Sequence, residues 1–230
     1  MQPLVACVLL TADRPAMTER AVKSFLGQTY QRKALLVFDN SKGLIVDSGI
    51  RQGIAYAEAS QFRGQSIGAL RNAANELASV ADIIAHWDSD DWSHPYRLAE
   101  QVNLLQAARA DAVGYNDMLF WKRLGADVSR ESWLYRYTPE REAGRYALGT
   151  SLLYWRRVWE KNRFEEVNAG EDRGFVQRVR CVSTSGLGCQ PRMIAEIHGT
   201  NTVQRPDIIT GDNFSRVPEW DSYCRERMSL

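Results

Sequence analysis

The first half of the chain alternates short apolar runs with stretches of helical periodicity, and no other feature restricts the fold as much. Continuous apolar runs predict strands buried on both faces at residues 4–10, 34–40 and 81–87, with a shorter strand near 54–57. Apolar side chains recur every three or four residues in three predicted helices, at 13–27, 64–79 and 95–108. This alternation predicts an α/β fold with a mostly parallel central sheet and helices on both faces.

The second half has a less regular pattern. We expect a hairpin at 111–122, a long polar and aromatic loop at 124–144, a strand at 145–155, a short helix at 156–162, a helix beginning at Glu171-Asp172 and a strand within 191–202. The chain has 230 residues, which suits one domain made of a first half (about 1–110), a second half (about 111–205) and a tail (206–230).

Charge and cysteine content narrow the class of protein. Lys plus Arg number 29 and Asp plus Glu 28, so the chain lacks the excess of basic residues that would indicate a nucleic-acid partner. The four cysteines include no CxxC pair and are interpreted as reduced thiols. The apolar run at the start is too short for a signal peptide or a membrane span. We therefore expect a soluble cytoplasmic protein with no integral membrane segment.

Three carboxylates stand directly after the strand predicted at 81–87. Asp88, Asp90 and Asp91 lie within four residues, at the end of a strand where α/β sheets bind ligands. Thr11 and Asp39 end two other predicted strands and belong to the same edge. Crowded carboxylates repel one another, which raises the pKa of at least one of them. A divalent cation such as Mg²⁺ or Mn²⁺ relieves that repulsion and keeps coordination positions open for a diphosphate.

Two simpler interpretations compete for this cluster. An EF-hand calcium loop counted from Asp88 needs glycine at its sixth position and glutamate at its twelfth, which here are Ser93 and Ala99, so it is excluded. A solvated turn in which Asp91 precedes a helix remains open.

Four features in order resemble family 2 of the nucleotide-sugar glycosyltransferases, which are inverting enzymes of the GT-A fold. Asp88-Ser89-Asp90-Asp91 after an apolar strand resembles their DxD signature. The segments "IGALRNAAN" and "AGEDRGF" resemble their arginine-asparagine helix and their later glutamate-aspartate motif, and Thr11 and Asp39 end the first two strands. The resemblance covers roughly residues 4–202 and makes 1–110 the nucleotide-sugar-binding half and 111–205 the acceptor and catalytic half.

The resemblance implies a role for each matching residue. It places Thr11 and Asp39 at the nucleoside, Arg71 at the diphosphate, Asp88 near the ribose, Asp90 as the main ligand of Mn²⁺ or Mg²⁺ with Asp88, Asp91 and His198 near the metal, and Asp172 as catalytic base with Glu171 beside it. Taken singly, each has a structural alternative, such as a strand end for Thr11 or a helix-dipole partner for Glu171 and Asp172.

The implied reaction moves a sugar from a nucleoside diphosphate, uridine-linked by default, to an unknown acceptor hydroxyl. Asp172 takes the hydroxyl proton while the cation offsets the charge of the leaving diphosphate. Three tryptophans, Trp92, Trp121 and Trp133, are candidates for stacking on a sugar, and the loop near 125–145 for closing over the donor. The tail is expected to pack back on the domain or to support a homodimer.

Two other functions stay open. A sugar-1-phosphate nucleotidyltransferase also uses acids and a metal on such a sheet, but "LLTADRPAMTER" lacks the glycines of its phosphate loop. A non-catalytic nucleotide-sugar-binding module would keep the donor site without turnover.

Overall fold

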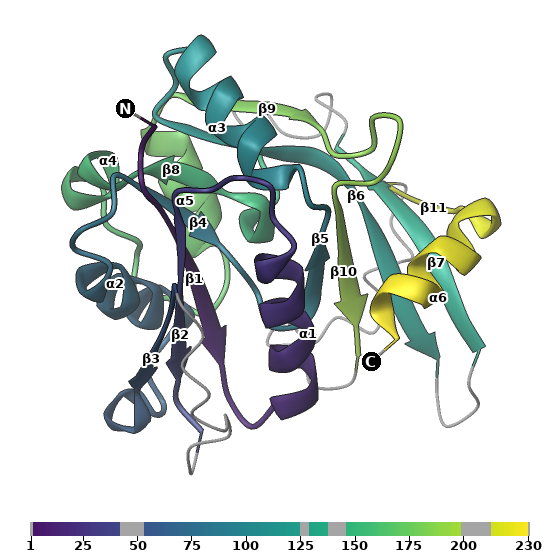
Figure 1. Cartoon of the computed structure of the whole chain (residues 1–230), viewed down its shortest axis with the longest axis horizontal. Helices are drawn as coiled ribbons and strands as arrows, with labels where there is room; N and C mark the ends of the chain where they lie inside the picture. Colours follow the sequence, from purple (N-terminus) through teal and green to yellow (C-terminus); the bar gives the residue numbers. More distant parts are fainter. Residues whose placement is uncertain (1, 42–52, 125–128, 138–145, 199–212, 230) are drawn as a thin grey trace.

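The computed structural model describes residues 2–41, 53–124, 129–137, 146–198 and 213–229 (Figure 1). Its strands form one mixed sheet of eleven, in which the path β11-β7-β6-β8-β4-β1-β2-β3 is joined by β5, β9 and β10. None of the helices in these ranges has both the length and the apolar character needed to cross a bilayer.

Four parallel strands confirm the fold expected for the first half. They are β1 (Val5–Thr11), β2 (Lys33–Asp39), β3 (Ile54–Glu58) and β4 (Ile83–His86). In the sheet they stand in the order β4-β1-β2-β3, with Thr11 level with Asp39 and Asp39 level with Glu58. The strand ends predicted to form a site therefore lie along one edge.

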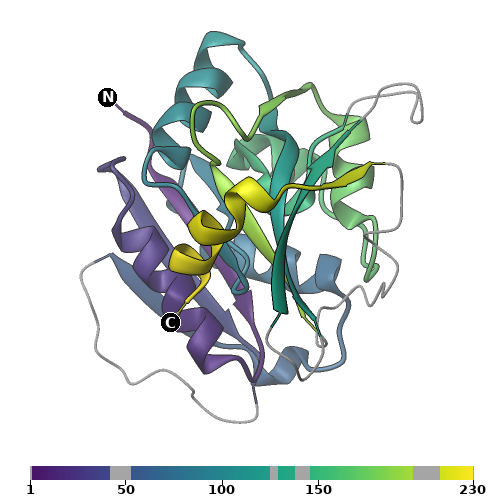
Figure 2. The same ribbon diagram turned by 90° about the vertical axis from the view of Figure 1, so that its right-hand side faces the viewer.

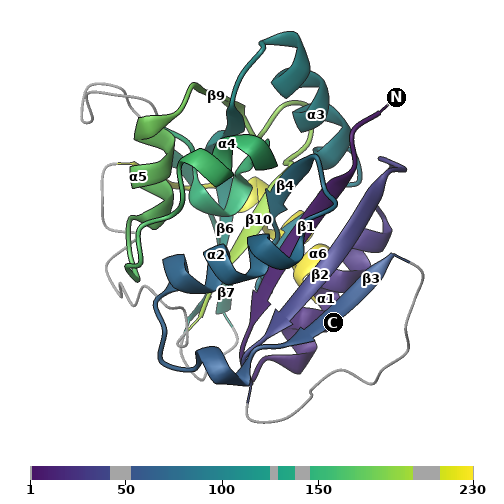
Figure 3. The same ribbon diagram turned by 90° about the vertical axis from the view of Figure 1, so that its left-hand side faces the viewer.

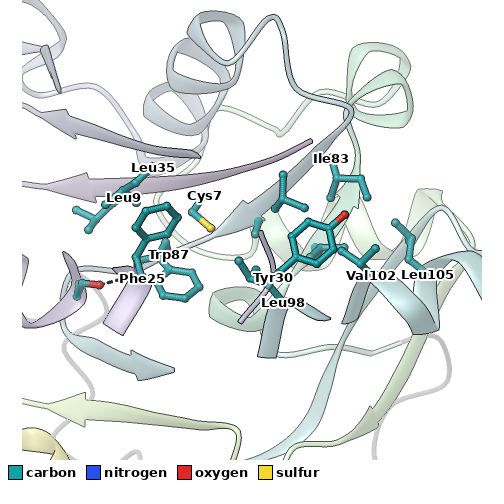
Figure 4. Close-up of a cluster of buried hydrophobic side chains, with 14 of the residues drawn as sticks. Cys7, Leu9, Phe25, Tyr30, Leu35, Ile83, Trp87, Leu98, Val102 and Leu105 are labelled. Atoms are coloured by element: carbon teal, nitrogen blue, oxygen red, sulfur yellow. Dashed lines mark hydrogen bonds between the residues drawn. The ribbon is translucent and has the colours of Figure 1, made fainter. Parts of the chain in front are cut away.

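Helices cover both faces of this sheet, because apolar residues of the strands face both sides. Val5, Cys7 and Leu9 of β1 pack with α1 (Pro15–Leu26) and α3 (Arg97–Ala107), in the cluster drawn in Figure 4. The alternate residues Ala6 and Val8 pack with α2 (Ile67–Leu77), α4 (Arg156–Lys161) and α5 (Glu171–Arg178). Figure 3 shows α1 and α2 on opposite faces of the strands.

The second half is organised by one long strand, β6 (Ala112–Leu124). Near its start β6 lies between β8 (Leu153–Trp155) and β9 (Cys181–Ser185), and near its end between β7 (Ser129–Arg136) and β10 (Met193–Ile197). The hairpin predicted at 111–122 is therefore wrong, since this segment is one strand and its hairpin partner is β7. The same finding corrects the loop predicted at 124–144, of which residues 125–128 and 138–144 lie outside the described ranges.

Two further departures concern short elements, and one short turn lies where no element was predicted. The strand predicted at 145–155 contains a 3₁₀ turn, η2 (Gly149–Ser151), before β8. The strand β5 (Asp91–Ser93) runs antiparallel to β10, although its residues were read as part of the turn before a helix. Another 3₁₀ turn, η1 (Ser60–Phe62), follows β3.

The tail packs back on the sheet. It forms β11 (Phe214–Arg216), which pairs with β7, then η3 (Pro218–Trp220) and α6 (Asp221–Met228). Cys224 and Met228 of α6 are buried in one cluster with Leu119 and Trp121 of β6 and Ile194 of β10. Figure 2 shows α6 lying across these two strands. Trp121 is fully buried in this cluster, so its prediction as a sugar-stacking residue is wrong.

Candidate active site

The ends of β1 and β2 are tied together by polar contacts. The Asn40 amide donates to the Thr11 carbonyl at 3.0 Å, and the Thr11 and Thr18 hydroxyls are 2.7 Å apart. One carboxylate oxygen of Asp39, Oδ1, accepts from the Ser41 amide at 2.9 Å and from its hydroxyl, which in turn accepts from the Asp13 amide at 2.7 Å. These bonds hold Thr11 and Asp39 side by side in a fixed arrangement.

The second carboxylate oxygen of Asp39, Oδ2, is suited to accept a hydrogen bond from a ligand. The Asp39 side chain is buried, and within the part of the chain that the structure describes Oδ2 has no hydrogen-bond partner. A buried carboxylate oxygen without a donor is costly, so such an atom suits a ligand that brings its own N–H or O–H. This is the chemistry that a nucleobase or a ribose offers.

Arg71 connects the acid cluster to the helix α5. Its Nη2 lies 3.4 Å from Asp88 Oδ1, and its Nε lies 3.3 Å from Glu171 Oε1. Arg71 comes from α2 and is buried, and its remaining nitrogen, Nη1, is buried with no partner among the described residues. The sequence placed Arg71 at a diphosphate; the structure engages it with two carboxylates and leaves one nitrogen available.

The pKa values of the two carboxylates that contact Arg71 are shifted in opposite directions. Burial works against the charge of Asp88, but Arg71 and the neighbouring His86 outweigh it and hold the pKa of Asp88 below its usual value. Burial raises the pKa of Glu171, and Arg71 offsets only part of that effect. Glu171 is thus occupied with Arg71, which makes it a structural partner of the acid cluster.

Asp90 contacts three basic side chains. Its Oδ2 lies 3.1 Å from His198 Nε2 and 3.3 Å from Arg14 Nη1, and its backbone carbonyl accepts from Arg20 Nη2 at 3.0 Å. The pairing of β5 with β10 sets Asp91 level with Ala195 and so brings the Asp88–Asp91 turn to His198, just past the end of β10. This contact between residues far apart in sequence agrees with the grouping that the resemblance implied.

The Asp91 side chain contacts the turn η2. Its Oδ2 accepts a hydrogen bond from the Thr150 hydroxyl in η2, and the side chain is buried. Burial, together with the nearby Asp90 and Asp88, raises the pKa of Asp91 well above its usual value. Asp91 therefore retains a proton more easily than Asp88.

Asp172 stands in the first turn of α5, half-buried, next to Glu171. Its Oδ1 accepts from the Arg173 amide at 2.7 Å, and its carboxylate lies against the backbone of Gly149 in η2. Because Glu171 contacts Arg71 and Arg71 contacts Asp88, Asp172 is placed on the same edge of the sheet as the acid cluster.

The residues that hold a cation would be Asp90 and His198. Within the described residues no group of three or more His, Cys, Asp or Glu side chains converges in the manner of a metal site. The carboxylate oxygen of Asp90 and the ring nitrogen of His198 do converge, and these two residues would hold a divalent cation such as Mn²⁺ or Mg²⁺, which would offset the charge of a diphosphate. The sequence-predicted ligand Asp91 is held by Thr150 and does not belong to this pair.

Sequence reasoning missed three residues of the site: Arg14, Gly149 and Thr150. Arg14 follows the end of β1, so its place at the ligand edge was readable from the strand pattern alone. Gly149 and Thr150 lie in a turn that was read as a strand. Of the remaining stacking candidates, Trp92 packs edge-on against His94 and Tyr223, and Trp133 donates its ring nitrogen to Glu131.

The sequence matches no protein-family model and no curated protein. Solved structures do resemble the fold. Residues 1–349 of S. aureus TarS bound to UDP-GlcNAc give a TM-score of 0.63 at 12% identity, covering 86% of this chain and 60% of that one. The mannosyltransferase PcManGT of Pyrobaculum calidifontis, in complex with GDP-Man and Mn²⁺, gives 0.61 at 14% identity, covering 91% and 60%.

A longer TarS structure gives a TM-score of 0.61 at 15% identity, covering 84% of this chain and 37% of that one. The chain thus spans between about a third and two thirds of the length of the structures it resembles. At these identities the likeness shows the fold, and it confirms the GT-A fold expected from the sequence.

Proposed function

We propose that this protein is an inverting glycosyltransferase that moves a sugar from a nucleoside-diphosphate donor to an acceptor hydroxyl with the help of a divalent cation. The observation that carries the proposal is the chain of contacts from Asp88 through Arg71 to Glu171, next to Asp172. It joins the end of a central strand to a helix whose sequence lies more than eighty residues away. The structures with bound UDP, UDP-GlcNAc and GDP-Man with Mn²⁺ support the same donor class.

The donor's nucleoside fits the edge formed by β1 and β2. Thr11 and Asp39 are fixed there, and Asp39 Oδ2 accepts a donor group from the base or the ribose. Asp88, kept ionised by Arg71, lies next along this edge and can accept from a ribose hydroxyl. These contacts set the orientation of the donor before any bond changes.

The diphosphate is met by positive charge around Asp90. Arg14 lies beside Asp90, and Arg71 lies beside Asp88 in the same turn, with its Nη1 buried and without a partner among the described residues. A bound cation at Asp90 and His198 would offset the charge that develops on the leaving diphosphate. Preorganised charge of this kind stabilises the transition state without reorganisation during the reaction.

Asp172 accepts the proton of the acceptor hydroxyl as the oxygen attacks the anomeric carbon. Attack from the side opposite to the leaving diphosphate breaks the sugar–phosphate bond and forms the new glycosidic bond with inversion. Glu171 is held by Arg71 and so leaves this task to Asp172.

The test starts with a thermal-shift screen of UDP-GlcNAc, UDP-glucose and GDP-mannose, each with Mn²⁺, Mg²⁺ or EDTA. A donor at 100 times its Kd stabilises the native state by about 2.7 kcal/mol. Release of nucleoside diphosphate is then measured with a panel of glycosides as acceptors. A synthetic activity would appear instead as pyrophosphate released from a nucleoside triphosphate and a sugar phosphate, and binding without turnover would indicate a binding module.

Two variants assign the roles. Asp172→Asn keeps the donor-induced shift and loses transfer by about 10²–10⁴-fold, which is the usual contribution of a general base. Asp90→Asn loses the difference between Mn²⁺ and EDTA. Asp82→Asn is the matched control, because Asp82 is exposed at the opposite end of β4. Unchanged transfer in Asp172→Asn would remove Asp172 from the mechanism.

A further inference from the structure

The carboxylate of Asp172 occupies space that only a glycine at position 149 leaves free. A Cβ on Gly149 would overlap Asp172 Oδ2 and would lie 2.6 Å from its Cγ and 2.9 Å from its Cβ. Carbon atoms do not approach so closely without displacement, since packed interiors have no slack to absorb it. The backbone of Gly149 is thus the surface on which the carboxylate of Asp172 rests.

Gly149 is itself held firmly from the core. Its carbonyl accepts from His86 Nδ1 at 2.7 Å, so this ring nitrogen carries the proton. The other ring nitrogen of His86 lies 3.3 Å from the Tyr154 hydroxyl. His86 is buried in β4, so the position of Gly149 is set by the central strand that ends in the acid cluster.

The two residues after Gly149 are fixed in the same way. The Thr150 carbonyl accepts from Arg97 Nη2 at 3.1 Å, and the Ser151 carbonyl accepts from Gln101 Nε2 at 2.7 Å, both from the buried helix α3. The Thr150 hydroxyl donates to Asp91. One three-residue turn therefore contacts Asp172 on one side and the acid cluster on the other.

We propose that Gly149 is a positioning residue, which sets the place of the Asp172 carboxylate relative to the donor because η2 is anchored to the strand that carries the acid cluster. This inference rests on the proposed function of Asp172 as the base. It goes beyond that function by assigning a role to a residue with no reactive group.

The variant Gly149→Ala tests it. The added methyl group displaces the Asp172 carboxylate, and a misplacement of about 1 Å costs on the order of 100-fold in rate. We expect kcat for transfer from UDP-GlcNAc, or from whichever donor the screen selects, to fall by about that factor. The donor's Kd should stay within about twofold, since the donor contacts lie on β1, β2 and the acid cluster. Gly174→Ala, on the same helix as Asp172, is the matched control. A Cβ there would meet only the ends of two flexible side chains, Glu165 at 3.1 Å and Arg178 at 3.4 Å.

A double-mutant cycle separates positioning from general damage. If Gly149 acts through Asp172, adding Gly149→Ala to Asp172→Asn lowers the residual rate by less than about threefold. An equal loss in both backgrounds, or a wild-type kcat in Gly149→Ala, would overturn the inference. If Asp172→Asn itself transfers at the wild-type rate, the proposed function is at fault instead.

A readout without activity covers the case in which Gly149→Ala folds poorly. Asp172→Ala removes the carboxylate that the new methyl group meets, so it should recover most of the urea midpoint that Gly149→Ala loses. No recovery in the double variant would show that the crowding at Gly149 does not involve Asp172, and the inference would fail.

Discussion

Asp88 and Asp91 stand at the two ends of one acidic turn, yet their pKa values are shifted in opposite directions. Asp88 has Arg71 at 3.4 Å, and its pKa lies below the usual value although burial works against it. Asp91 is buried with a hydroxyl for a partner, and burial together with its acidic neighbours raises its pKa well above the usual value. Asp88 and Asp91 are three positions apart, yet the pKa of one is lowered and that of the other is raised.

The comparison shows that crowded acids need not share one counter-ion. Here the acids of the turn have different partners: Arg71 for Asp88, and Arg14 and His198 for Asp90. The Thr150 hydroxyl donates to Asp91 and also favours the ionised form of Asp88. The sequence argument assumed that a cation among all three relieves their repulsion. In the structure these side chains offset part of that repulsion, and the cation at Asp90 stays a prediction.

The largest effect is expected when the positive charge that Arg71 places beside Asp88 is removed. Arg71→Met leaves Asp88 and the buried Glu171 without their shared partner, and loss of one partner of a buried ion pair costs about 3 kcal/mol or more. Urea unfolding at pH 7 measures the loss. Arg63→Met is the control, because Arg63 and its partner Asp13 are exposed and such pairs contribute little. A deficit below about 1 kcal/mol in Arg71→Met would mean that Asp88 does not depend on Arg71.

The paired amides Asp88→Asn and Asp91→Asn should change stability in opposite directions. Asp88→Asn loses a charged hydrogen bond to Arg71 and should cost about 1.5 kcal/mol at pH 7. Asp91→Asn keeps an acceptor for Thr150 and removes a charge that burial disfavours, so it should stabilise by about 1 kcal/mol at pH 8. Both are measured by urea unfolding with EDTA present.

The pH dependence gives the sign for each acid. A lowered folded-state pKa, as in Asp88, adds stability that is present above the unfolded pKa and is lost as pH falls through the folded pKa. A raised one, as in Asp91, adds stability that is full below the unfolded pKa and is lost as pH rises through the folded pKa. The deficit of Asp88→Asn should therefore shrink towards pH 3, and the gain of Asp91→Asn should vanish near pH 4. Parallel curves for the two variants would contradict the assignment.

The elements that carry Thr11, Asp39 and Arg71 could be predicted from the sequence. The strands that end at Thr11 and Asp39 are long apolar runs buried on both faces, so their positions and their shared edge followed from periodicity alone. The helix that carries Arg71 and Asn72 was equally clear. Asn72 receives bonds from the Trp159 ring and the Phe164 amide, which explains a poor helix former in a buried helix.

The second half was harder for physical reasons. The three-residue strands β8 in this half, β5 before it and β11 in the tail are too short for any periodicity to show. They exist because longer neighbours pair with them: β10 holds β5, and β4 and β6 hold β8. The contact of Asp91 with Thr150 depends on such pairing, so the opposite fates of Asp88 and Asp91 had no signal in the sequence.

The finest test of the comparison is Thr150→Val, which removes the hydroxyl that donates to Asp91 and that also favours the ionised form of Asp88. The hydroxyl donates to the carboxylate and favours its ionised form, so the variant should lose about 1 kcal/mol at a pH where Asp91 is ionised. As pH falls and Asp91 takes up a proton, this bond weakens and the deficit should decrease. Thr184→Val, on the exposed part of β9, should stay within about 0.5 kcal/mol of wild type at every pH. A deficit in Thr150→Val that is independent of pH would show that Asp91 keeps one protonation state throughout, and that its contrast with Asp88 is one of packing alone.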